Sequence, residues 1–503
     1  MKKDFQKIML TIFLFCGIVV LPAQNTYEEA ITKENAQKFL IKLYTDMQDF
    51  HPNLYQYFSK QNYDMVYNEM MQNLDTADFY NPDKLYSVLK EFVALCRDAH
   101  SSIGMNIPFK SSLNQNSNVP NQTPPTINTF PFHPNIIKGK MYVAYHCFGD
   151  DFISVKSEIV SIGKQSTEEW LQKRRARISA ERDEYKDAQI SRHSVPIIST
   201  DSCIFGYIPH GSQDTLYKTL CCKTTRNHYI ECLSNYLGKE GFTVERKDLL
   251  PFRPLDEGRI GIIKMGNFYP VKIMLPFINI ALDSLKFYGA TDLIIDLRES
   301  SGGHAESGYA LLDRITNKSY RTNSEELFFI KHAMLTSDNP AARNIYTSRK
   351  YLKKNEIKSI MKAGKDTIFS YQYPEIIPKK YKNKFTGRIW VLTGSYTFSA
   401  AVGLAAIVQD CQLGTVVGNE TGGIPNTYGN ILTYPLTGIM DKKILKYYYF
   451  APFIKFIRPS GNDLYLRGVI PDIEIDPNII INEDKQLQTL IEIIREQRNN
   501  YNK

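Results

Sequence analysis

The sequence predicts a layered α/β fold for its C-terminal half, and two observations support this. From Arg259 onward, short apolar stretches alternate with longer amphipathic ones, which is typical of strands and helices that build one sheet with helices packed over it. In addition, the apolar strands at 293–295 and 389–392 each lead into a loop of small residues and then a helix. We therefore expect an α/β core whose chemistry lies in the loops at its strand ends.

The N-terminal part of the chain predicts an export signal followed by helices. Residues 1–24 resemble a signal peptide, with three early lysines, an apolar run over 8–21 and a cleavage site near Ala23 or Gln24. Residues 25–125 form a helical region and linker, because apolar residues recur at helical spacing in 27–47 and 82–96. Asn81 and Pro82 mark the start of the second helix, and residues 111–125 are rich in Asn, Ser, Gln and Pro, as in a loop.

The middle of the chain predicts a β-rich module over 126–250. Short strands are expected at 140–145, 157–162 and 203–208, with a helix at 166–177. The core is then expected over 251–480, and a C-terminal helix over 481–503. Within the core the expected elements are strands at 261–265, 292–296, 389–392 and 414–417, and helices at 277–287, 305–316 and 399–409. Residues 318–385 do not fit this alternation and suggest an insertion that faces the substrate.

Composition limits the possible partners and compartments. The net charge of +8 is spread over 503 residues with 53 acidic ones and forms no basic stripe, so nucleic acid is not expected as a partner. No segment after the signal is apolar enough for a stable membrane span. Eight cysteines include Cys16 in the signal, and one or two disulfides are expected within a cluster in the middle module, Cys203, Cys221, Cys222 and Cys232. Their spacing does not suit zinc, so we expect no metal.

The loops after two core strands contain the parts of an acyl-transfer site. Ser399 precedes a helix of small residues, where it could act as a nucleophile beside the helix's positive end, although serine is also a common helix cap. Gly302 and Gly303 could supply uncrowded backbone N–H groups for an oxyanion hole together with the N–H of Ala400. We favour the catalytic interpretation because both loops occur in one core.

Four stretches, taken together, resemble the tail-specific or C-terminal-processing serine peptidases, and within them the tricorn-like branch. They are residues 95–101 (Leu-Cys-Arg-Asp-Ala-His-Ser), 292–298 with Gly302 and Gly303, 392–401 with 418–423, and 468–473 (Gly-Val-Ile-Pro-Asp-Ile). This resemblance implies a crotonase- or ClpP-like core, suggests a PDZ-like middle module, and implies no cofactor.

The resemblance also implies which residue acts as the general base for Ser399. Where the processing branch has a lysine, this chain has Ile424, so a Ser–Lys dyad is absent. The tricorn-like branch uses a histidine near the end of the N-terminal region, which corresponds to His100. A third group should orient the imidazole; Asp463 and Ser101 are the main possibilities, and Asp98 and Glu420 are others.

The sequence therefore predicts an exported, periplasmic or extracellular serine peptidase that cleaves peptide bonds through an acyl-enzyme on Ser399 with His100 as base. Two alternatives remain open. One is a non-catalytic ligand- or peptide-binding protein on the same scaffold, as in the family's retinoid-binding relatives, which the variant Ser300-Ser301 favours. The other is a crotonase-type acyl-thioester enzyme, against which export argues. Oligomeric state cannot be predicted.

Overall fold

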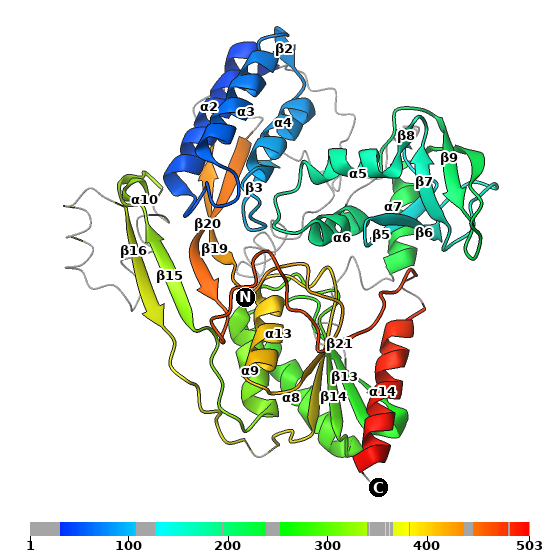
Figure 1. Ribbon diagram of the computed structural model, residues 1–503, viewed down its shortest axis with the longest axis vertical. Coiled ribbons are helices and arrows are strands. Elements are labelled where there is room, and N and C mark those ends of the chain that lie inside the picture. The colour runs from blue at the N-terminus through cyan, green and yellow to red at the C-terminus, as the bar shows by residue number, and fades with distance from the viewer. Residues whose placement is uncertain are drawn as a thin grey trace, which may run out of the picture.

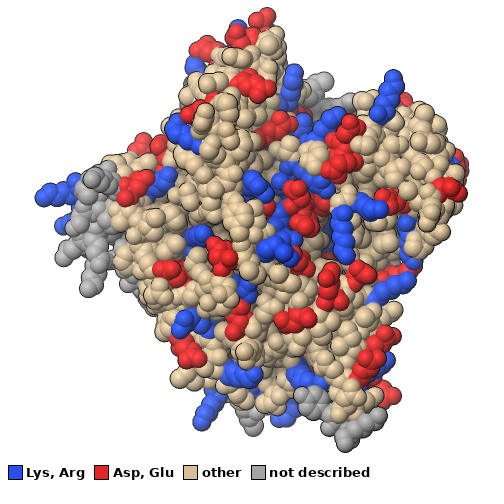
Figure 2. Space-filling model, viewed as in Figure 1, with Lys and Arg blue, Asp and Glu red and all other residues tan. Residues whose placement is uncertain are grey.

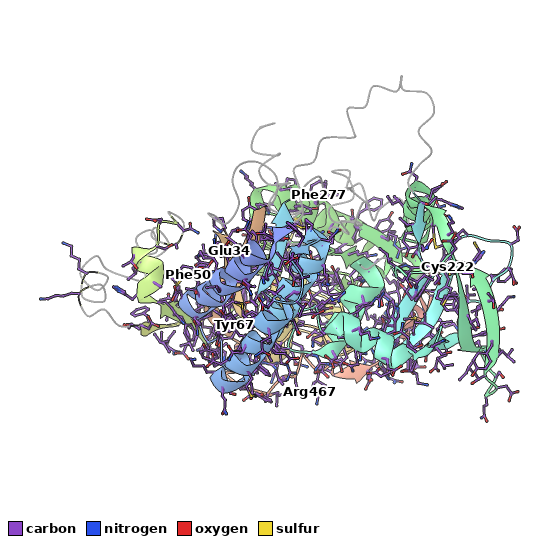
Figure 3. The ribbon with its side chains drawn as sticks, turned by 90° about the horizontal axis from the view of Figure 1, so that it is seen from above. Glu34, Phe50, Tyr67, Cys222, Phe277 and Arg467 are labelled. Atoms are coloured by element: carbon purple, nitrogen blue, oxygen red, sulfur yellow. A yellow bond between two sulfur atoms is a disulfide. The ribbon has the colours of Figure 1, made fainter. Side chains whose placement is uncertain are left out.

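The computed structural model describes residues 31–106, 126–193, 196–237, 252–339, 366–381, 383–436, 446–480 and 483–501, together with 342, 358 and 362. The expected signal peptide and the loop at 111–125 lie outside these residues. The described chain forms three parts: an N-terminal helical region and a β-rich middle module lie side by side, and the α/β core lies below them in the view of Figure 1. Figure 3 shows the same two parts from above.

The N-terminal region packs its helices on a sheet that the rest of the chain completes. Its helices are α2 (Lys33–Phe50), α3 (Lys60–Asn73) and α4 (Pro82–Ala94), and β1 (Ile31–Thr32) pairs with β2 (Phe79–Tyr80). Helix α4 starts at Pro82 as expected, and the Asn81 side chain accepts the Asp83 N–H. Beyond α4, β3 (Ser102–Asn106) joins the sheet β16-β15-β20-β19 by pairing with the first residues of β20.

The segment 318–385 contributes strands to that sheet. Its described residues include β15 (Glu325–Ile330), α10 (His332–Thr336) and β16 (Thr367–Gln372), which lie beside β20 (Lys446–Ile457) and β19 (Tyr428–Pro435). Phe328 and Ile330 of β15 belong to the same buried cluster as Phe39 and Leu43 of α2. The segment thus interrupts the βα alternation of the core, as expected, and its strand β15 packs alternate buried residues against the N-terminal helices.

The middle module is a sheet with helices on one side and a disulfide at its far end. Its sheet order is β10-β9-β7-β6-β5, and a further pair joins β11 to β4. The strands are β4 (Thr126–Asn128), β5 (Phe132–Ile137), β6 (Lys140–His146), β7 (Glu158–Ile162), β8 (Gln165–Ser166), β9 (Ser202–Ile208), β10 (Leu216–Cys221) and β11 (Lys223–Thr225), and the helices are α5 (Thr167–Arg175), α6 (Asp183–His193) and α7 (Arg226–Leu237). Trp170 of α5 is buried in its core with Phe130 and Phe205. This confirms a β-rich character but does not test the PDZ-like assignment.

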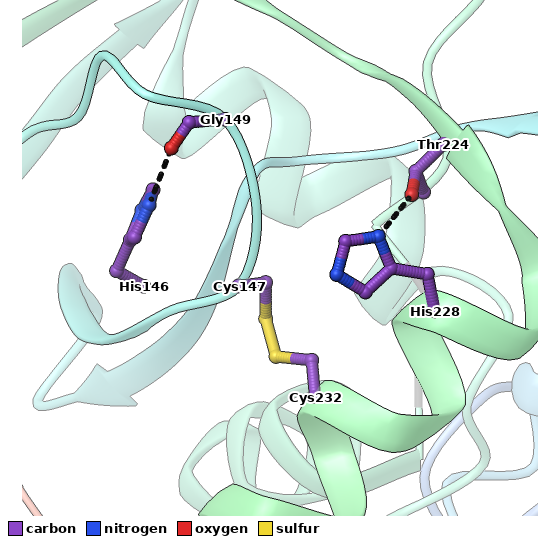
Figure 4. The surroundings of a disulfide bond; sticks show 6 residues. All are labelled: His146, Cys147, Gly149, Thr224, His228 and Cys232. Carbon is purple, nitrogen blue, oxygen red and sulfur yellow. Dashed lines mark hydrogen bonds between the residues drawn. A yellow bond between two sulfur atoms is a disulfide. The ribbon is translucent and has the colours of Figure 1, made fainter.

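The disulfide of this module differs from the one expected. Cys147 after β6 is bonded to Cys232 of α7 (Figure 4), whereas Cys203, Cys221 and Cys222 are free thiols. The prediction of pairs within the cluster at 203–232 was wrong. Cys221 and Cys222 are sequence neighbours at the end of β10, while the fold carries Cys232 away on α7, to a Cα–Cα distance of 5.2 Å from Cys147.

The core has the predicted βα architecture. Strands β13, β14, β17, β18 and β21 are parallel, and β12 is added antiparallel at one edge. The strands are β12 (Phe252–Leu255), β13 (Ile260–Lys264), β14 (Asp292–Asp296), β17 (Arg388–Thr393), β18 (Thr415–Gly418) and β21 (Ile473–Glu474), and the helices are α8 (Val271–Tyr288), α9 (Ala305–Ile315), α13 (Ala400–Asp410) and α14 (Lys485–Tyr501). The layered α/β prediction is confirmed.

Two buried clusters show why the central strands are apolar throughout. Leu293, Ile295 and Val391 face α8, α9 and α13, whereas Ile294 and Trp390 face α14 on the other side of the sheet. A parallel sheet covered on both faces buries both sets of alternating side chains. Consequently the carboxyl ends of β14 and β17 lie side by side, and the loops that follow them meet.

Charged side chains of both signs are interspersed over the face shown in Figure 2. Ion pairs also join the parts, such as Arg182 with Glu420 and Lys156 with Glu483. Within the described residues, no helix is long and apolar enough to cross a membrane.

Candidate active site

Ser399 occupies a strained turn between β17 and α13. Its backbone has φ 55° and ψ −124°, a conformation that residues other than glycine rarely adopt. The turn is fixed by Thr397, whose Oγ1 accepts the Gly394 N–H and donates to Leu297 O, and by the Phe398 N–H, which donates to Ser300 O. The Ser399 side chain makes no capping hydrogen bond. The geometry thus resembles a nucleophile elbow more than a helix cap.

His100 faces Ser399 from a different part of the chain. The two residues are 299 positions apart, and His100 Nε2 lies 3.0 Å from Ser399 Oγ. The imidazole is buried, with 5% of its residue surface exposed, and stacks on the Phe398 ring at a centroid distance of 4.7 Å. The predicted contact between these two side chains is therefore present, and its length is that of a hydrogen bond.

Asp98 is the acidic residue closest to this histidine in the hydrogen-bond network. Its Oδ1 accepts the His100 backbone N–H at 3.0 Å, and its Oδ2 accepts the Ser101 hydroxyl at 2.7 Å and lies 3.2 Å from His51 Nε2. Asp98 and His51 are each 1% exposed. Asp98 therefore fixes the backbone of the turn that carries the imidazole.

Neither of the two main predictions for the orienting group contacts the imidazole. Asp463 is exposed on the loop after β20 and has no hydrogen bond or ion pair within the described residues, so that assignment is wrong. Ser101 is buried, but its hydroxyl donates to Asp98. Glu420 is paired with Arg182 and Arg467 instead. His100 Nδ1 is buried without a hydrogen-bond partner among the described residues.

The glycine loop after β14 lies directly against the serine loop. A Cβ placed on Gly302, whose φ is +83°, would stand 2.7 Å from Ala400 N and 2.8 Å from Ser399 Cβ. Gly303, with φ +130°, approaches Phe268 O just as closely. Ala400 opens α13, so its N–H has no partner in the preceding turn of the helix. Gly302 and Ala400 thus bring backbone N–H groups beside Ser399. Gly303 packs the other side of the loop against Phe268.

The electrostatics favour a neutral imidazole beside an ionised Asp98. Burial lowers the pKa of His100 below 6.5, and the negative charge of Asp98 opposes that effect. Burial alone would raise the pKa of Asp98, but its hydrogen bonds with His51 and Ser101 and its electrostatic interaction with the two imidazoles hold that pKa below 3.8. At neutral pH His100 can therefore accept a proton from Ser399.

Among the described residues, no cluster of three or more His, Cys, Asp or Glu side chains could hold a metal ion. Asp296 and Arg298 form a brace with Asp484, with Arg298 Nη1 at 2.7 Å from Asp484 Oδ1. These ion pairs connect the start of the glycine loop to the segment before α14, so Asp296 and Arg298 have a structural role.

Residues 259–475 match the family model described as peptidase family S41. This segment is therefore similar in sequence to members of that family. The match indicates that the chain is a serine peptidase, whose substrates are peptides or proteins. The match covers the strands and loops that carry Ser399 and Gly302, whereas His100 lies outside it.

Solved structures show the same fold over nearly the whole chain. Mature CPAF is 14% identical with a TM-score of 0.58, covering 88% of this chain and 92% of that one. CPAF complexed with lactacystin is 14% identical with a TM-score of 0.58, covering 93% and 99%. A point mutant of CPAF is 13% identical with a TM-score of 0.60, covering 88% and 93%. No curated protein sequence matches this chain significantly.

Sequence reasoning missed several residues that surround the site. His51 follows α2 directly, and Ser179, Glu181 and Tyr185 come from the middle module. None lies in a recognisable motif, so their positions follow only from the way the three parts pack together.

Proposed function

We propose that this peptidase hydrolyses peptide bonds through an acyl-enzyme on Ser399, with His100 as general base and then general acid. The observation that carries the proposal is the 3.0 Å contact between His100 Nε2 and Ser399 Oγ. Asp98 supports it as an ionised group behind the histidine. A neutral imidazole at hydrogen-bond distance is the arrangement that activates a serine hydroxyl.

The geometry suggests the following sequence of steps. His100 Nε2 takes the Ser399 proton while Oγ attacks the scissile carbonyl carbon, and the carbonyl oxygen becomes negatively charged. Backbone N–H groups of the loop at Gly302 and Gly303 and of Ala400 stabilise that charge. The imidazolium then donates its proton to the leaving amine as the C–N bond breaks. A water, deprotonated by His100, then attacks the acyl carbon. As the bond from that carbon to Oγ breaks, the imidazolium returns the proton to Ser399 Oγ and the acid product leaves.

We further propose that the protein is exported. The signal-like residues 1–24 support this, as does the disulfide between Cys147 and Cys232, a bond that persists mainly in oxidising compartments. N-terminal sequencing of the mature protein tests the proposal, with a start near Asn25 as the expected result. An intact Met1 on protein from the cytoplasm would contradict it.

A fluorophosphonate probe, which labels activated serines, tests the mechanism. We expect labelling of Ser399 in the parent protein and turnover of a quenched fluorescent peptide library. Ser399→Ala and His100→Ala should each lower kcat by on the order of 10⁴-fold, and the double variant should lose little more, because nucleophile and base act as one unit.

Two matched control variants distinguish a loss of catalysis from a loss of folded protein. Ser284→Ala removes an exposed serine hydroxyl from α8, and His146→Ala removes a histidine whose Nε2 is bonded to Gly149 O (Figure 4). Both should leave labelling and turnover unchanged. Full activity in Ser399→Ala would refute the assignment of the nucleophile. A correctly folded parent without labelling or turnover would instead favour the binding-protein alternative.

A further inference from the structure

One segment of the middle module contacts every part of the candidate site. It runs from Ser179 through α6 to Arg192, between the sheet of the module and the core. Part of it packs with Tyr396 and Phe398 of the serine loop and with Ala99 of the histidine turn in a single buried cluster. The segment is therefore placed to set the relative position of nucleophile and base.

Ser179 clamps the backbone of the residue two positions before His100. Its Oγ accepts the Asp98 N–H at 3.1 Å and donates to the Asp98 carbonyl oxygen at 2.7 Å. The same oxygen lies 3.3 Å from Cys96 Sγ. A hydroxyl that binds both the donor and the acceptor of one peptide residue fixes that residue's orientation.

Glu181 binds a neighbouring residue of the same turn. Its backbone carbonyl oxygen accepts Arg97 Nη2 at 3.1 Å, and its carboxyl is buried, with 3% of the residue exposed. Arg97 has φ 53°, a strained value for a residue other than glycine, and such strain persists only where surrounding contacts enforce it. Burial and the charge of Asp98 raise the pKa of Glu181 to about 8, so this carboxyl is protonated at neutral pH.

The remainder of the segment contacts the core side of the site. Tyr185 stacks on Phe398 at a ring distance of 4.5 Å, directly before Ser399. Arg182 pairs with Glu420, and Arg192 pairs with Glu299, the residue that precedes Ser300 in the glycine loop. The contacts to both loops thus originate on one short stretch of chain.

We propose that the segment from Ser179 to Arg192 is the positioning element of the peptidase site, with Ser179 and Glu181 holding the turn that presents His100 to Ser399. The inference rests on the proposed role of His100. It assigns to the middle module a part in catalysis that is distinct from substrate binding, because none of these contacts requires a bound peptide.

Ser179→Ala tests this positioning role. With the turn released, we expect kcat on the peptide library and the rate of fluorophosphonate labelling to fall about 10- to 100-fold, since a displacement of about 1 Å has effects of that size. KM should change little, because substrate contacts are retained. Ser179→Thr keeps a hydroxyl and should restore most of the activity.

Thr167→Ala is the matched control. Thr167 Oγ1 also donates to a backbone group, Ile159 O at 2.7 Å, but this contact lies inside the module and outside the Ser179–Arg192 segment. We expect Thr167→Ala to lower the thermal midpoint at least as much as Ser179→Ala while leaving kcat unchanged. Equal losses of activity in both variants would show that module stability, rather than positioning, limits the rate, and would overturn the inference.

Glu181 supplies a second, independent comparison. Glu181→Gln keeps the size and neutral charge of the protonated carboxyl, so activity should be retained, whereas Glu181→Ala leaves a cavity beside Asp98 and should lower kcat as Ser179→Ala does. If His100→Ala abolishes labelling but Ser179→Ala and Glu181→Ala do not lower kcat, the positioning role is wrong while the proposed mechanism stands. If His100→Ala has no effect, the proposed mechanism itself fails.

Discussion

The loop that carries Ser399 and the turn that carries His100 meet at 3.0 Å, but different contacts hold their backbones. The serine loop is fixed within the core: Thr397 bonds to Leu297 O, Phe398 to Ser300 O, and the Gly423 N–H to Thr397 O. All of these partners follow neighbouring strands of one parallel sheet. The backbone hydrogen bonds around the strained Ser399 thus come from the core.

The histidine turn depends on residues that are distant from it in the sequence, two of them from another region. His51 comes from the end of α2, and Ser179 and Glu181 come from the middle module. The comparison shows that nucleophile and oxyanion groups belong to a locally built unit, whereas the base is positioned by long-range packing. Variants in the core should therefore affect transition-state stabilisation, and variants at the turn should affect proton transfer.

The largest effect expected from a single change outside the Ser–His pair is that of Gly302→Ala. A methyl group there would collide with Ala400 N and Phe398 O at 2.7 Å, and its φ of +83° disfavours any side chain. Displacement of an oxyanion donor should lower kcat by about 10²–10³-fold. Steady-state turnover of the peptide library measures this loss.

Gly403→Ala serves as the control because it lies in α13 and a Cβ there meets open space. It should retain activity and gain up to about 1 kcal/mol of stability, the difference in helix propensity between the two residues. Full activity in Gly302→Ala would show that this loop does not contact the reacting carbonyl.

Asp98→Asn should alter the pH dependence of kcat/KM, because that dependence reports the protonation of His100. In the parent, the acid limb of kcat/KM is expected below pH 6.5, because burial lowers the pKa of His100 and only the neutral imidazole accepts a proton. Removing the Asp98 charge removes the effect that raises this pKa, so the limb should move to still lower pH. The plateau should fall about tenfold for each unit of basicity lost.

Asp463→Asn is the appropriate comparison for that experiment. The exposed Asp463 makes no contact with His100, so its variant should reproduce the parent pH profile. A shift of the acid limb to higher pH in Asp98→Asn would contradict the electrostatic role given to Asp98. An altered profile in Asp463→Asn would restore the assignment that the structure rejects.

The difference between the serine loop and the histidine turn also explains which site residues could be predicted from the sequence. Strand β14 spans Asp292–Asp296, as expected, because a run of apolar residues between a turn and a glycine loop has few other solutions in an α/β core. Ser399, Gly302 and Ala400 follow such strands directly, so local pattern was sufficient to locate them.

The histidine turn was located only by its resemblance to a family motif, and its supports were not located at all. Ser179 is an ordinary serine after α5, and Glu181 would be expected on the surface, since glutamate is seldom fully buried. Their roles arise from packing between parts that are 81 or more residues apart. The prediction of the disulfide was wrong for the same reason, since the partner of Cys232 lies 85 residues upstream.

The smallest effect on catalysis is expected from removing the disulfide. Cys147→Ala combined with Cys232→Ala opens a covalent link that closes 85 residues of chain and should lower the stability of the module by about 2–4 kcal/mol. The bond joins the end of β6 to α7, whereas the contacts to the site come from the Ser179–Arg192 segment. At 25 °C, kcat should therefore stay near the parent value while calorimetry shows a lower thermal midpoint. Ser179→Ala should give the opposite result, a large loss of kcat with a small loss of stability. If the disulfide variant loses kcat in proportion to its stability, the module acts on the site as a whole, and the distinction between positioning contacts and general support does not hold.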